Sequence, residues 1–381
     1  MTARGLRRTS GFGRAVAVGV LSTLAACKSH GAALQFDSTP LAPKPERLRG
    51  PYPTELSGAA LEGERAFVAP APFPAPLRDV MGIDYYTDFR HSEIDPVLKA
   101  KNEAEEAPMR ELGRSLIAYS DGYLRSQRQS AELASAALDG LFGWAERDAL
   151  LGRVNRAGLY QLKWALASYT LDYLKIRDEP ALDPKKKQRV EHWFRQLADR
   201  VVAYQNANPN WPDHWNNHAY WSALAVASAG VAVGDRALFD WGIQHYDVFT
   251  SRLRPDGVLP DELGRGQRAL HYHLFSIAPL VMLAELAEAN GVHLYPVANR
   301  ALTRLAGLCL TGLKEPNTLG AKAGVRQVSP ERSDLAWLEP YYARSHDARA
   351  LPWLNQRPLE SGFLGGDLTL GFGVPLPETT P

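Results

Sequence analysis

The sequence predicts an all-α fold, and two observations carry that prediction. Apolar side chains recur at spacings of three and four residues from about residue 103 to 313, as in Leu112, Leu116 and Tyr119. Short clusters of Gly, Pro, Asn and Asp interrupt the pattern, and no stretch there alternates apolar and polar residues as a half-buried strand would. The segments between the clusters are therefore predicted to be helices that pack on one another. An α/α toroid and a helical solenoid both satisfy the pattern, and no clear sequence repeat selects the solenoid.

The individual helices follow from the same spacing, taken in chain order. Their periodic stretches cover residues 109–123, 159–174, 190–201, 238–249 and 274–283. Turn-forming residues cluster between them at residues 178–184, 206–213, 234–235, 255–257 and 289–291. Near the C-terminus, the apolar residues 368–372 are predicted to be a short strand.

The first 27 residues are predicted to be an export signal. Four arginines precede an apolar run from residue 15 to about residue 24, roughly half the length that a membrane-spanning helix needs. The run ends in Leu24-Ala25-Ala26-Cys27, which matches the lipobox at which bacterial lipoproteins are cleaved and lipidated on the cysteine. We therefore expect a periplasmic protein with a lipid anchor at Cys27, and a soluble periplasmic protein is the alternative.

The rest of the chain divides into two parts. Residues 28–78 are rich in proline and alanine and have no lasting period, which predicts a tether and wrapping segment. The helical domain is predicted to cover residues 79–381. Because Cys27 and Cys309 are the only cysteines, no intramolecular disulfide is expected, and stability must come from a packed core.

Charge and motif content exclude several classes of function. The chain carries 43 basic and 42 acidic residues, so the mature chain without the leader arginines is close to neutral and no nucleic-acid partner is expected. A local cationic cleft can still bind an acidic polymer. The sequence has no phosphate loop, dinucleotide fingerprint or G-x-S-x-G elbow, so ATP, NAD and serine-esterase chemistry have no support.

The segment W-P-D-H-W-N-N-H-A-Y-W, residues 211–221, concentrates polar and aromatic groups where a helix is expected to begin. Asn217 and His218 lie four and three residues before Trp221, so the three side chains share one face of a helix. Together with Trp215 they are suited to line a sugar cleft. The alternative is a capping asparagine beside ordinary core tryptophans, which explains single residues but not the whole cluster.

A second unusual segment, D-G-V-L-P-D-E-L-G-R-G-Q-R-A-L-H-Y-H, covers residues 256–273. Arg265, Arg268 and Tyr272 have spacings of three and four, so a helix stacks two guanidinium groups and a phenol on one side. Glu262 lies one turn earlier and is placed to hold an arginine. The alternative is a solvated basic face.

His271 and His273 in this segment raise the question of a metal site. Their spacing of two points them to different sides of a helix, and neither a cysteine ligand nor an H-E-x-x-H pattern accompanies them. We therefore expect no metal and no cofactor.

The motifs N-N-H-A-Y-W and R-G-Q-R-A-L-H-Y-H resemble those of the alginate lyases of polysaccharide lyase family 5. The likeness runs from about Asp84 to the end of the chain and includes Y-Y-T-D, L-K-W-A-L and W-L-E-P-Y. It implies an incomplete α/α toroid with a deep cleft, no metal requirement, and endolytic cleavage of poly-β-D-mannuronate by β-elimination. Alginate is then the expected partner, and the machinery that exports alginate is a further candidate.

The resemblance also assigns residues. It implies catalytic roles for Asn217, His218, Arg265 and Tyr272. It places Tyr85, Tyr86 and Arg90 on a lid loop over the cleft, and it requires a late arginine for which Arg344 and Arg357 both qualify. The further substrate contacts that we expect are Asn155, Arg156, Trp215, Trp221, Glu262, Arg268 and Arg344.

These residue types suit an elimination. Removal of the C5 proton builds charge on the uronate carboxylate, and donors such as Asn217, His218 and Arg265 stabilise that charge. Tyr272 is expected to act as base and then as acid, provided that Arg265 and Arg268 favour the phenolate. The alternatives are a glycoside hydrolase and a non-catalytic polysaccharide-binding lipoprotein. A hydrolase needs two paired carboxylates, and the carboxylates available near the motifs, Asp213, Asp256, Asp261 and Glu262, form no obvious pair.

Overall fold

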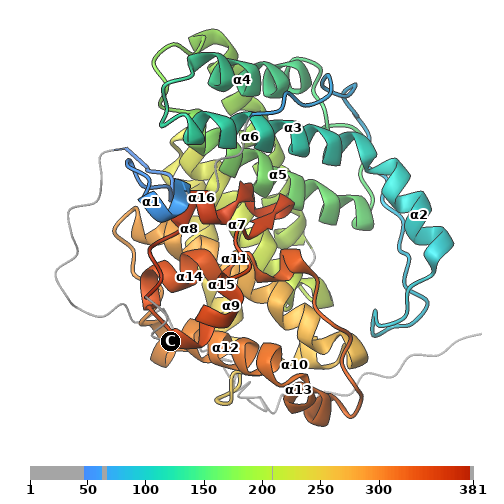
Figure 1. Ribbon diagram of the computed structural model, residues 1–381. Helices are drawn as coiled ribbons and strands as arrows, with labels where there is room; N and C mark the ends of the chain where they lie inside the picture. Colours follow the sequence, from blue (N-terminus) through green and yellow to red (C-terminus); the bar gives the residue numbers. More distant parts are fainter. Residues whose placement is uncertain (1–46, 62–66, 208, 378–381) are drawn as a thin grey trace, which may run out of the picture. The chain divides into compact units, whose positions relative to one another are not determined.

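A computed structural model describes residues 47–61, 67–207 and 209–377 of the chain (Figure 1). The predicted export signal and the beginning of the Pro/Ala-rich segment lie outside these residues. The described part is mostly helical, which confirms the all-α prediction. Its helices are α1 (Gly58–Leu61), α2 (Pro96–Glu105), α3 (Ala107–Arg125), α4 (Ala131–Ala145), α5 (Arg156–Ile176), α6 (Pro184–Ala207), α7 (Asn217–Val233), α8 (Arg236–Gln244), α9 (Tyr246–Arg252), α10 (Pro260–Leu263), α11 (Ala269–Glu288), α12 (Val297–Lys314), α13 (Pro316–Ala323), α14 (Leu338–Ser345), α15 (Leu351–Leu354) and α16 (Leu368–Phe372).

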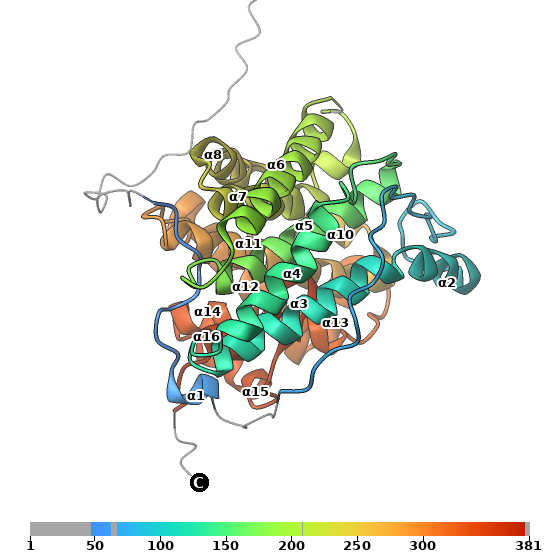
Figure 2. The ribbon, with the colours of Figure 1, turned by 90° about the horizontal axis from the view of Figure 1, so that it is seen from above.

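The long helices alternate between an inner and an outer position. Helices α3, α5, α7 and α11 contact one another in that order; α4 packs on α3, α12 packs on α11, and α6 and α8 pack on α7, beyond which Figure 2 shows them. Almost every residue of α5, α7 and α11 is buried. The outer helix α6 buries only the stripe with spacings of three and four that includes Trp193 and Leu197. The inner helices therefore form the core, and their N-terminal ends can present polar groups to a common cleft.

By length and composition, the segment Gly266–Glu288 is apolar enough to cross a membrane. Since 89% of its most apolar window is buried inside the described part of the chain, it is instead a core helix.

The first turns of two inner helices are fixed by asparagine caps. Asn155 caps α5, its Oδ1 accepting from the Gly158 N–H at 2.7 Å. Asn216 caps α7, its Oδ1 accepting from the His218 N–H at 2.9 Å. A side-chain cap satisfies an otherwise unpaired backbone donor, so each helix starts at a defined residue. The side chains that follow the caps are thereby set in place.

The C-terminal segment differs from the prediction. Residues 368–372 form the helix α16 and not a strand, because the Asp367 carboxylate accepts from the Leu370 N–H at 2.9 Å and caps the first turn. Only two-residue strands occur here, β1 (Glu360–Ser361) and β2 (Gly366–Asp367), which pair antiparallel. Helix α16 contacts α14 and α3 and so connects the last inner helices back to the first.

The described residues of the Pro/Ala-rich segment lie against the helices. The Arg49 N–H donates to the Asn290 side chain at 2.9 Å, and the Tyr52 ring packs on Phe372 at 5.6 Å between centroids. Leu48 is buried in the main core. This part of the segment therefore wraps the domain and adds to its core.

Candidate active site

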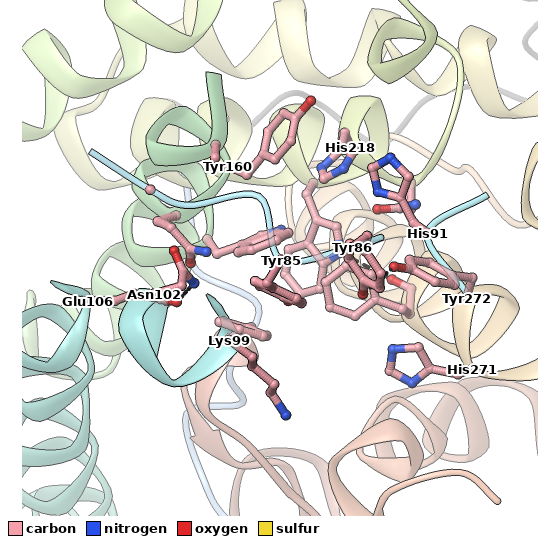
Figure 3. A pocket seen from close by; sticks show the side chains of 18 of the residues that line it. Tyr85, Tyr86, His91, Lys99, Asn102, Glu106, Tyr160, His218, His271 and Tyr272 are labelled. Atoms are coloured by element: carbon pink, nitrogen blue, oxygen red, sulfur yellow. Dashed lines mark hydrogen bonds between the residues drawn. The ribbon is translucent and has the colours of Figure 1, made fainter. Parts of the chain in front are cut away.

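A cleft of about 630 Å³ lies at the N-terminal ends of α5, α7 and α11 (Figure 3). The loop before α2, helix α2 itself and the 3-10 turn η3 (Arg332–Leu335) complete its walls. Ten of the residues predicted from the sequence line this cleft. They are Tyr85, Tyr86, Asn155, Arg156, Asn217, His218, Trp221, Arg265, Arg268 and Tyr272.

Glu262 organises the residues expected to bind the substrate carboxylate. Its side chain is fully buried, and Oε1 accepts from the backbone N–H of Asn217 at 2.7 Å and from its Nδ2 at 2.9 Å. Its second oxygen, Oε2, accepts from Nε of Arg265 at 3.3 Å. The prediction that Glu262 holds an arginine fits this contact. One buried carboxylate thus joins the start of α7 to the segment before α11. Because Glu262 does not line the cleft, the expectation that it contacts substrate needs correction.

Tyr272 faces the two predicted arginines and the lid loop. The guanidinium carbons of Arg265 and Arg268 lie 4.7 and 5.8 Å from the centroid of its ring. The predicted stack forms although α11 begins only at Ala269, because a 3-10 turn continues the same face before it. The Tyr272 hydroxyl donates to the Tyr86 hydroxyl at 2.7 Å.

The electrostatic effect on Tyr272 differs from the expectation. Burial raises the pKa of Tyr272 well above its ordinary value, and the neighbouring Tyr86 hydroxyl raises it further. The charges of Arg265 and Arg268 lower it but do not outweigh the burial. With Tyr86 in contact, Tyr272 is therefore a neutral phenol.

His218 is held between aromatic rings. Its imidazole stacks on Tyr160 at 3.8 Å and lies 5.9 Å from the Trp164 ring, centroid to centroid. Burial, and then the charges of Lys163 and Arg265, lower the pKa of His218 well below its ordinary value, so the ring is neutral at neutral pH. Among the described residues, its Nδ1 has no hydrogen-bond partner.

Asn217, the neighbour of His218, also has an unpaired polar atom. Its Oδ1 finds no partner in the part of the chain that the structure describes. A buried polar atom without a partner costs free energy, and the cost is recovered when a ligand supplies one. Both unpaired atoms belong to residues that line the cleft, which makes the start of α7 a candidate ligand contact.

Lys163 is a neighbour of the site that the sequence did not reveal. It is buried on α5, and its Nζ donates to the backbone carbonyl of His218 at 2.9 Å and lies 4.8 Å from the Tyr160 ring centroid. Burial lowers the pKa of Lys163 to about 7. The L-K-W-A-L segment gave no chemical reason to single it out, because its partners lie on another helix. Lys163 thus holds the backbone of His218 in place from α5.

Replacing Lys163 by methionine is expected to change how stability depends on pH. Its pKa is about 7 in the folded chain and near 10.5 when unfolded, so between these values the unfolded chain binds more protons and the wild type gains stability as pH rises. Thermal melts from pH 7 to 10 should show this rise, by up to a few kcal/mol, in the wild type and not in Lys163→Met. The exposed Lys185→Met is the control, and parallel curves for all three proteins would contradict the pKa. Turnover of Lys163→Met should also fall, because His218 loses its carbonyl contact.

Two further predicted residues, Arg156 and Asn155, form hydrogen bonds at the edge of the cleft. Arg156 donates from Nε to the Tyr160 hydroxyl at 2.7 Å and from Nη2 to Asp213 at 3.2 Å, and the Tyr160 hydroxyl donates to Asp213 at 2.9 Å. Asn155 caps α5 through its Oδ1, and its Nδ2 donates to the Gly82 carbonyl at 2.8 Å. Arg156 therefore fixes the ring on which His218 stacks, and Asn155 attaches the lid-loop side of the cleft to α5.

The cleft floor is aromatic. Trp221 donates from Nε1 to the Phe275 carbonyl at 3.1 Å, and its ring packs on Phe275 and Phe363. Trp164 lies against both phenylalanines as well. Except for Trp221, the sequence reasoning did not find these residues. Their aromatic type was visible, but only the packing of α5, α7 and α11 gathers them.

The lid loop is hydrogen-bonded to the segment that precedes α11. Asp88 accepts from the backbone N–H groups of Ser92 and Glu93, each at 2.8 Å, which fixes the turn. Gln267 donates to the Glu93 carboxylate at 2.9 Å. The backbone carbonyl of Arg90 accepts from Nη1 of Arg265 at 3.5 Å. The Arg90 side chain is exposed and does not line the cleft, so the expectation that it contacts substrate needs correction.

Three other predictions need correction. Arg344 does not line the cleft, because it pairs with Glu285 at 2.8 Å. Arg357 is no substitute, since it pairs with Glu339 at 2.8 Å. Trp215 is 41% exposed and lies outside the cleft, because the 3-10 turn that precedes α7 directs it to solvent.

No metal site is found among residues 47–61, 67–207 and 209–377, where no three His, Cys, Asp or Glu side chains are grouped for coordination. His273 is fully buried, with Nδ1 at 2.7 Å from the Ala269 carbonyl and Nε2 accepting from the Leu259 N–H at 3.1 Å. Both of its nitrogens are engaged in the core. The histidines of the H-Y-H segment thus do not act together.

Comparisons with known proteins identify the family. A family model described as alginate lyase matches residues 79–319. A polysaccharide lyase of Stenotrophomonas maltophilia is 37% identical over 324 residues, which cover 84% of this chain and 93% of the relative. An alginate lyase of Pseudomonas syringae pv. syringae is 34% identical over 360 residues, covering 83% and 93%.

Solved structures show the same fold. Alginate lyase A1-III from Sphingomonas species A1 superimposes with a TM-score of 0.71 at 23% identity, covering 87% of this chain and 98% of that one. A histidine-to-alanine variant of A1-III in complex with a tetrasaccharide gives a TM-score of 0.74 at 24% identity, covering 85% and 92%. This likeness confirms the α/α toroid. Together with the family match and the curated relatives, it shows that the chain belongs to the alginate lyase family.

Proposed function

We propose that this protein cleaves mannuronate-rich alginate by β-elimination and acts within the polymer chain. The observation that carries the proposal is the convergence of Asn217, His218 and Arg265 beside the Tyr272 ring in one cleft. Among the described residues, Asn217 Oδ1, an acceptor, and His218 Nδ1, which donates in one tautomer, have no partner, and Arg265 is a cation held by a buried carboxylate. Such an arrangement suits a substrate that carries a carboxylate next to an acidic C–H bond.

The proposed chemistry follows from where charge builds up. Loss of the C5 proton pushes negative charge onto the uronate carboxylate, and donors already held in place stabilise it without further reorganisation. Arg265 supplies a positive charge, and Asn217 and His218 supply polar contacts at the same end of the cleft. The C4–O bond then breaks and leaves an unsaturated sugar.

Tyr272 is proposed to carry both proton transfers. In mannuronate the C5 proton and the C4 oxygen lie on the same side of the ring, so one phenol reaches both. A bound sugar displaces the Tyr86 hydroxyl, which is one of the causes that raise the pKa of Tyr272, while Arg265 and Arg268 stay against the ring and continue to lower it. The two guanidinium charges thus lower the pKa of Tyr272, as a base needs, against the burial that raises it.

The length of the cleft supports cleavage within the chain. Its lining continues from Tyr272 and His218 to Lys99, Glu106 and Arg110, so a polymer bound at Tyr272 can contact the protein over more than one sugar. The aromatic floor offers flat apolar surfaces to sugar rings.

Incubation with defined polymers tests the function. Polymannuronate should yield products whose unsaturated ends absorb in the ultraviolet, with a rapid fall in viscosity, and polyguluronate should react more slowly. New reducing ends without the absorbance would indicate a hydrolase. Binding without any product would indicate a polysaccharide-binding protein.

Chelation is expected to leave turnover unchanged. The charge-stabilising groups are side chains of the protein, and the described residues offer no ligand set for a metal. Activity should therefore be the same before and after EDTA treatment and dialysis. Loss of turnover that a divalent ion restores would contradict this mechanism.

We also propose that the protein is a periplasmic lipoprotein, anchored through Cys27 and placed to meet alginate near its export machinery. The proposal rests on Leu24-Ala25-Ala26-Cys27 and the Pro/Ala-rich segment that follows. Cys27→Ser should move the protein from the membrane fraction to the soluble periplasmic fraction. Wild-type protein that is already entirely soluble would exclude the anchor.

A further inference from the structure

His271 faces the cleft and differs from the buried His273 two residues later. Its Nδ1 lies 3.0 Å from the Asp334 carboxylate, and the structure shows no partner for its Nε2 among the described residues. The ring lines the cleft beside Tyr272, as Figure 3 shows. His271 therefore has one nitrogen fixed by the protein and one available to a ligand.

Asp334 is itself held rigidly. Its Oδ2 also accepts from the Glu331 N–H at 2.9 Å, as part of the capping box of η3, and its side chain is 5% exposed. Because an ionised carboxylate only accepts hydrogen bonds, Nδ1 of His271 carries the proton. The tautomer is then fixed, and the lone pair of Nε2 is directed to the other side of the ring.

The plane of the imidazole is fixed as well. The ring stacks on Phe275 at 6.0 Å with an angle of 16° between planes, and it meets the Tyr272 ring edge-on at 5.2 Å. Asp334 holds Nδ1 and two aromatic rings contact the imidazole, so the direction of the Nε2 lone pair is fixed. Preorganisation of this kind is typical of a side chain that discriminates between ligands.

The neighbouring wall favours hydroxyl groups over carboxylates. Glu331, Ser333 and Asp334 line the cleft with His271, and the Glu331 carboxylate and the Ser333 hydroxyl offer oxygen acceptors, whereas Asp334 Oδ2 is already engaged by His271 and the Glu331 N–H. A polyuronate carries two kinds of polar group, carboxylates that accept and hydroxyls that donate. Acceptors on the wall repel the carboxylates and bind the hydroxyls.

We propose that His271, oriented by Asp334, accepts a hydrogen bond from a hydroxyl group of the sugar bound beside Tyr272, so that the cleft selects polymers whose hydroxyls are free over polymers whose hydroxyls are esterified. The inference rests on the proposed function, because it assumes a polyuronate in this cleft. It assigns specificity to a pair of residues that takes no part in the proton transfers. An ester at that hydroxyl removes the donor and leaves Nε2 unpaired, and a site built around a hydrogen bond strongly rejects a ligand that lacks it.

The test compares polymannuronate with the same polymer after chemical O-acetylation. Wild-type protein should prefer the free polymer by at least about tenfold in kcat/KM. In His271→Phe the flat ring stays against Phe275 but Nε2 is lost, and the preference should fall to within about threefold. Asp334→Asn keeps a cap for η3 but no longer fixes the tautomer, so it should lower the preference partly while His271 remains. The exposed His293→Phe should behave as wild type.

Binding measurements test this inference independently of the proposed function. The dissociation constants of free and acetylated mannuronate tetrasaccharides, measured by calorimetry, should show the same loss of preference in His271→Phe, and they require no turnover. The inference would be overturned if the wild type bound free and acetylated ligands equally well, or if His271→Phe kept the full wild-type preference for the free ligand. Absence of unsaturated products from the free polymer would instead overturn the lyase function, and the binding ratio would still decide the role of His271.

Discussion

Tyr272→Phe is expected to lower kcat on polymannuronate by about 10⁴-fold, while binding of the polymer stays within about threefold of wild type. The substitution removes one hydroxyl and keeps the ring that packs under the Arg265 and Arg268 guanidinium groups. In the free protein it removes only the hydrogen bond to Tyr86, so stability should change little. Initial rates of ultraviolet absorbance and calorimetric binding check the two parts separately.

His218→Ala distinguishes the roles of the two residues. It removes a partner of the carboxylate and the ring that stacks on Tyr160, so both binding and rate should suffer. An oligouronate with a better leaving group at C4 should partly rescue a variant that lacks only the acid. Rescue of Tyr272→Phe with none for His218→Ala would make His218 the base and leave Tyr272 only the acid. This outcome would be consistent with the neutral imidazole found here.

Outer helices such as α6 could be predicted because burial recurs along them every three or four residues, whereas α5, α7 and α11 are buried almost throughout. The stack of Arg265 and Arg268 on Tyr272 was predicted too, since its members are close in sequence and a 3-10 turn preserves their face. The strand predicted at residues 368–372 was wrong. There the apolar pattern was given more weight than the capping Asp367, which starts a helix.

The rest of the site depends on contacts between distant segments. Lys163 is linked to His218 by a hydrogen bond across 55 residues, and Arg344 reaches Glu285 across 59. Both separations are far longer than the spacing of neighbours on one helix, so no local sequence pattern predicts either contact. The sequence showed which residue types were present, and the packing of α5, α7 and α11 decided which of them meet in the cleft.

Glu262 is expected to have the largest effect among the residues that do not touch substrate. Glu262→Ala leaves the Arg265 guanidinium and the Asn217 backbone N–H without their buried partner. Breaking a buried ion pair from one side costs about 3–5 kcal/mol, so the free energy of unfolding should fall by about that amount and obscure the effect on activity. Denaturant unfolding measures this cost.

Glu262→Gln separates positioning from stability. The glutamine oxygen can still accept from the Asn217 N–H, so the fold should be retained, but its amide group donates and faces Nε of Arg265, which also donates. Arg265 then loses the contact that holds it over Tyr272. We expect kcat/KM to fall at least about a hundredfold, through both a higher KM and a lower kcat, with a melting temperature close to that of the wild type. Asp261→Asn is the matched control, because the adjacent carboxylate pairs with the partly exposed Arg252 and should contribute little. If Glu262→Gln kept wild-type kcat/KM, the buried carboxylate would be a structural group only, and the arrangement of Asn217 and Arg265 would have to come from the helix ends alone.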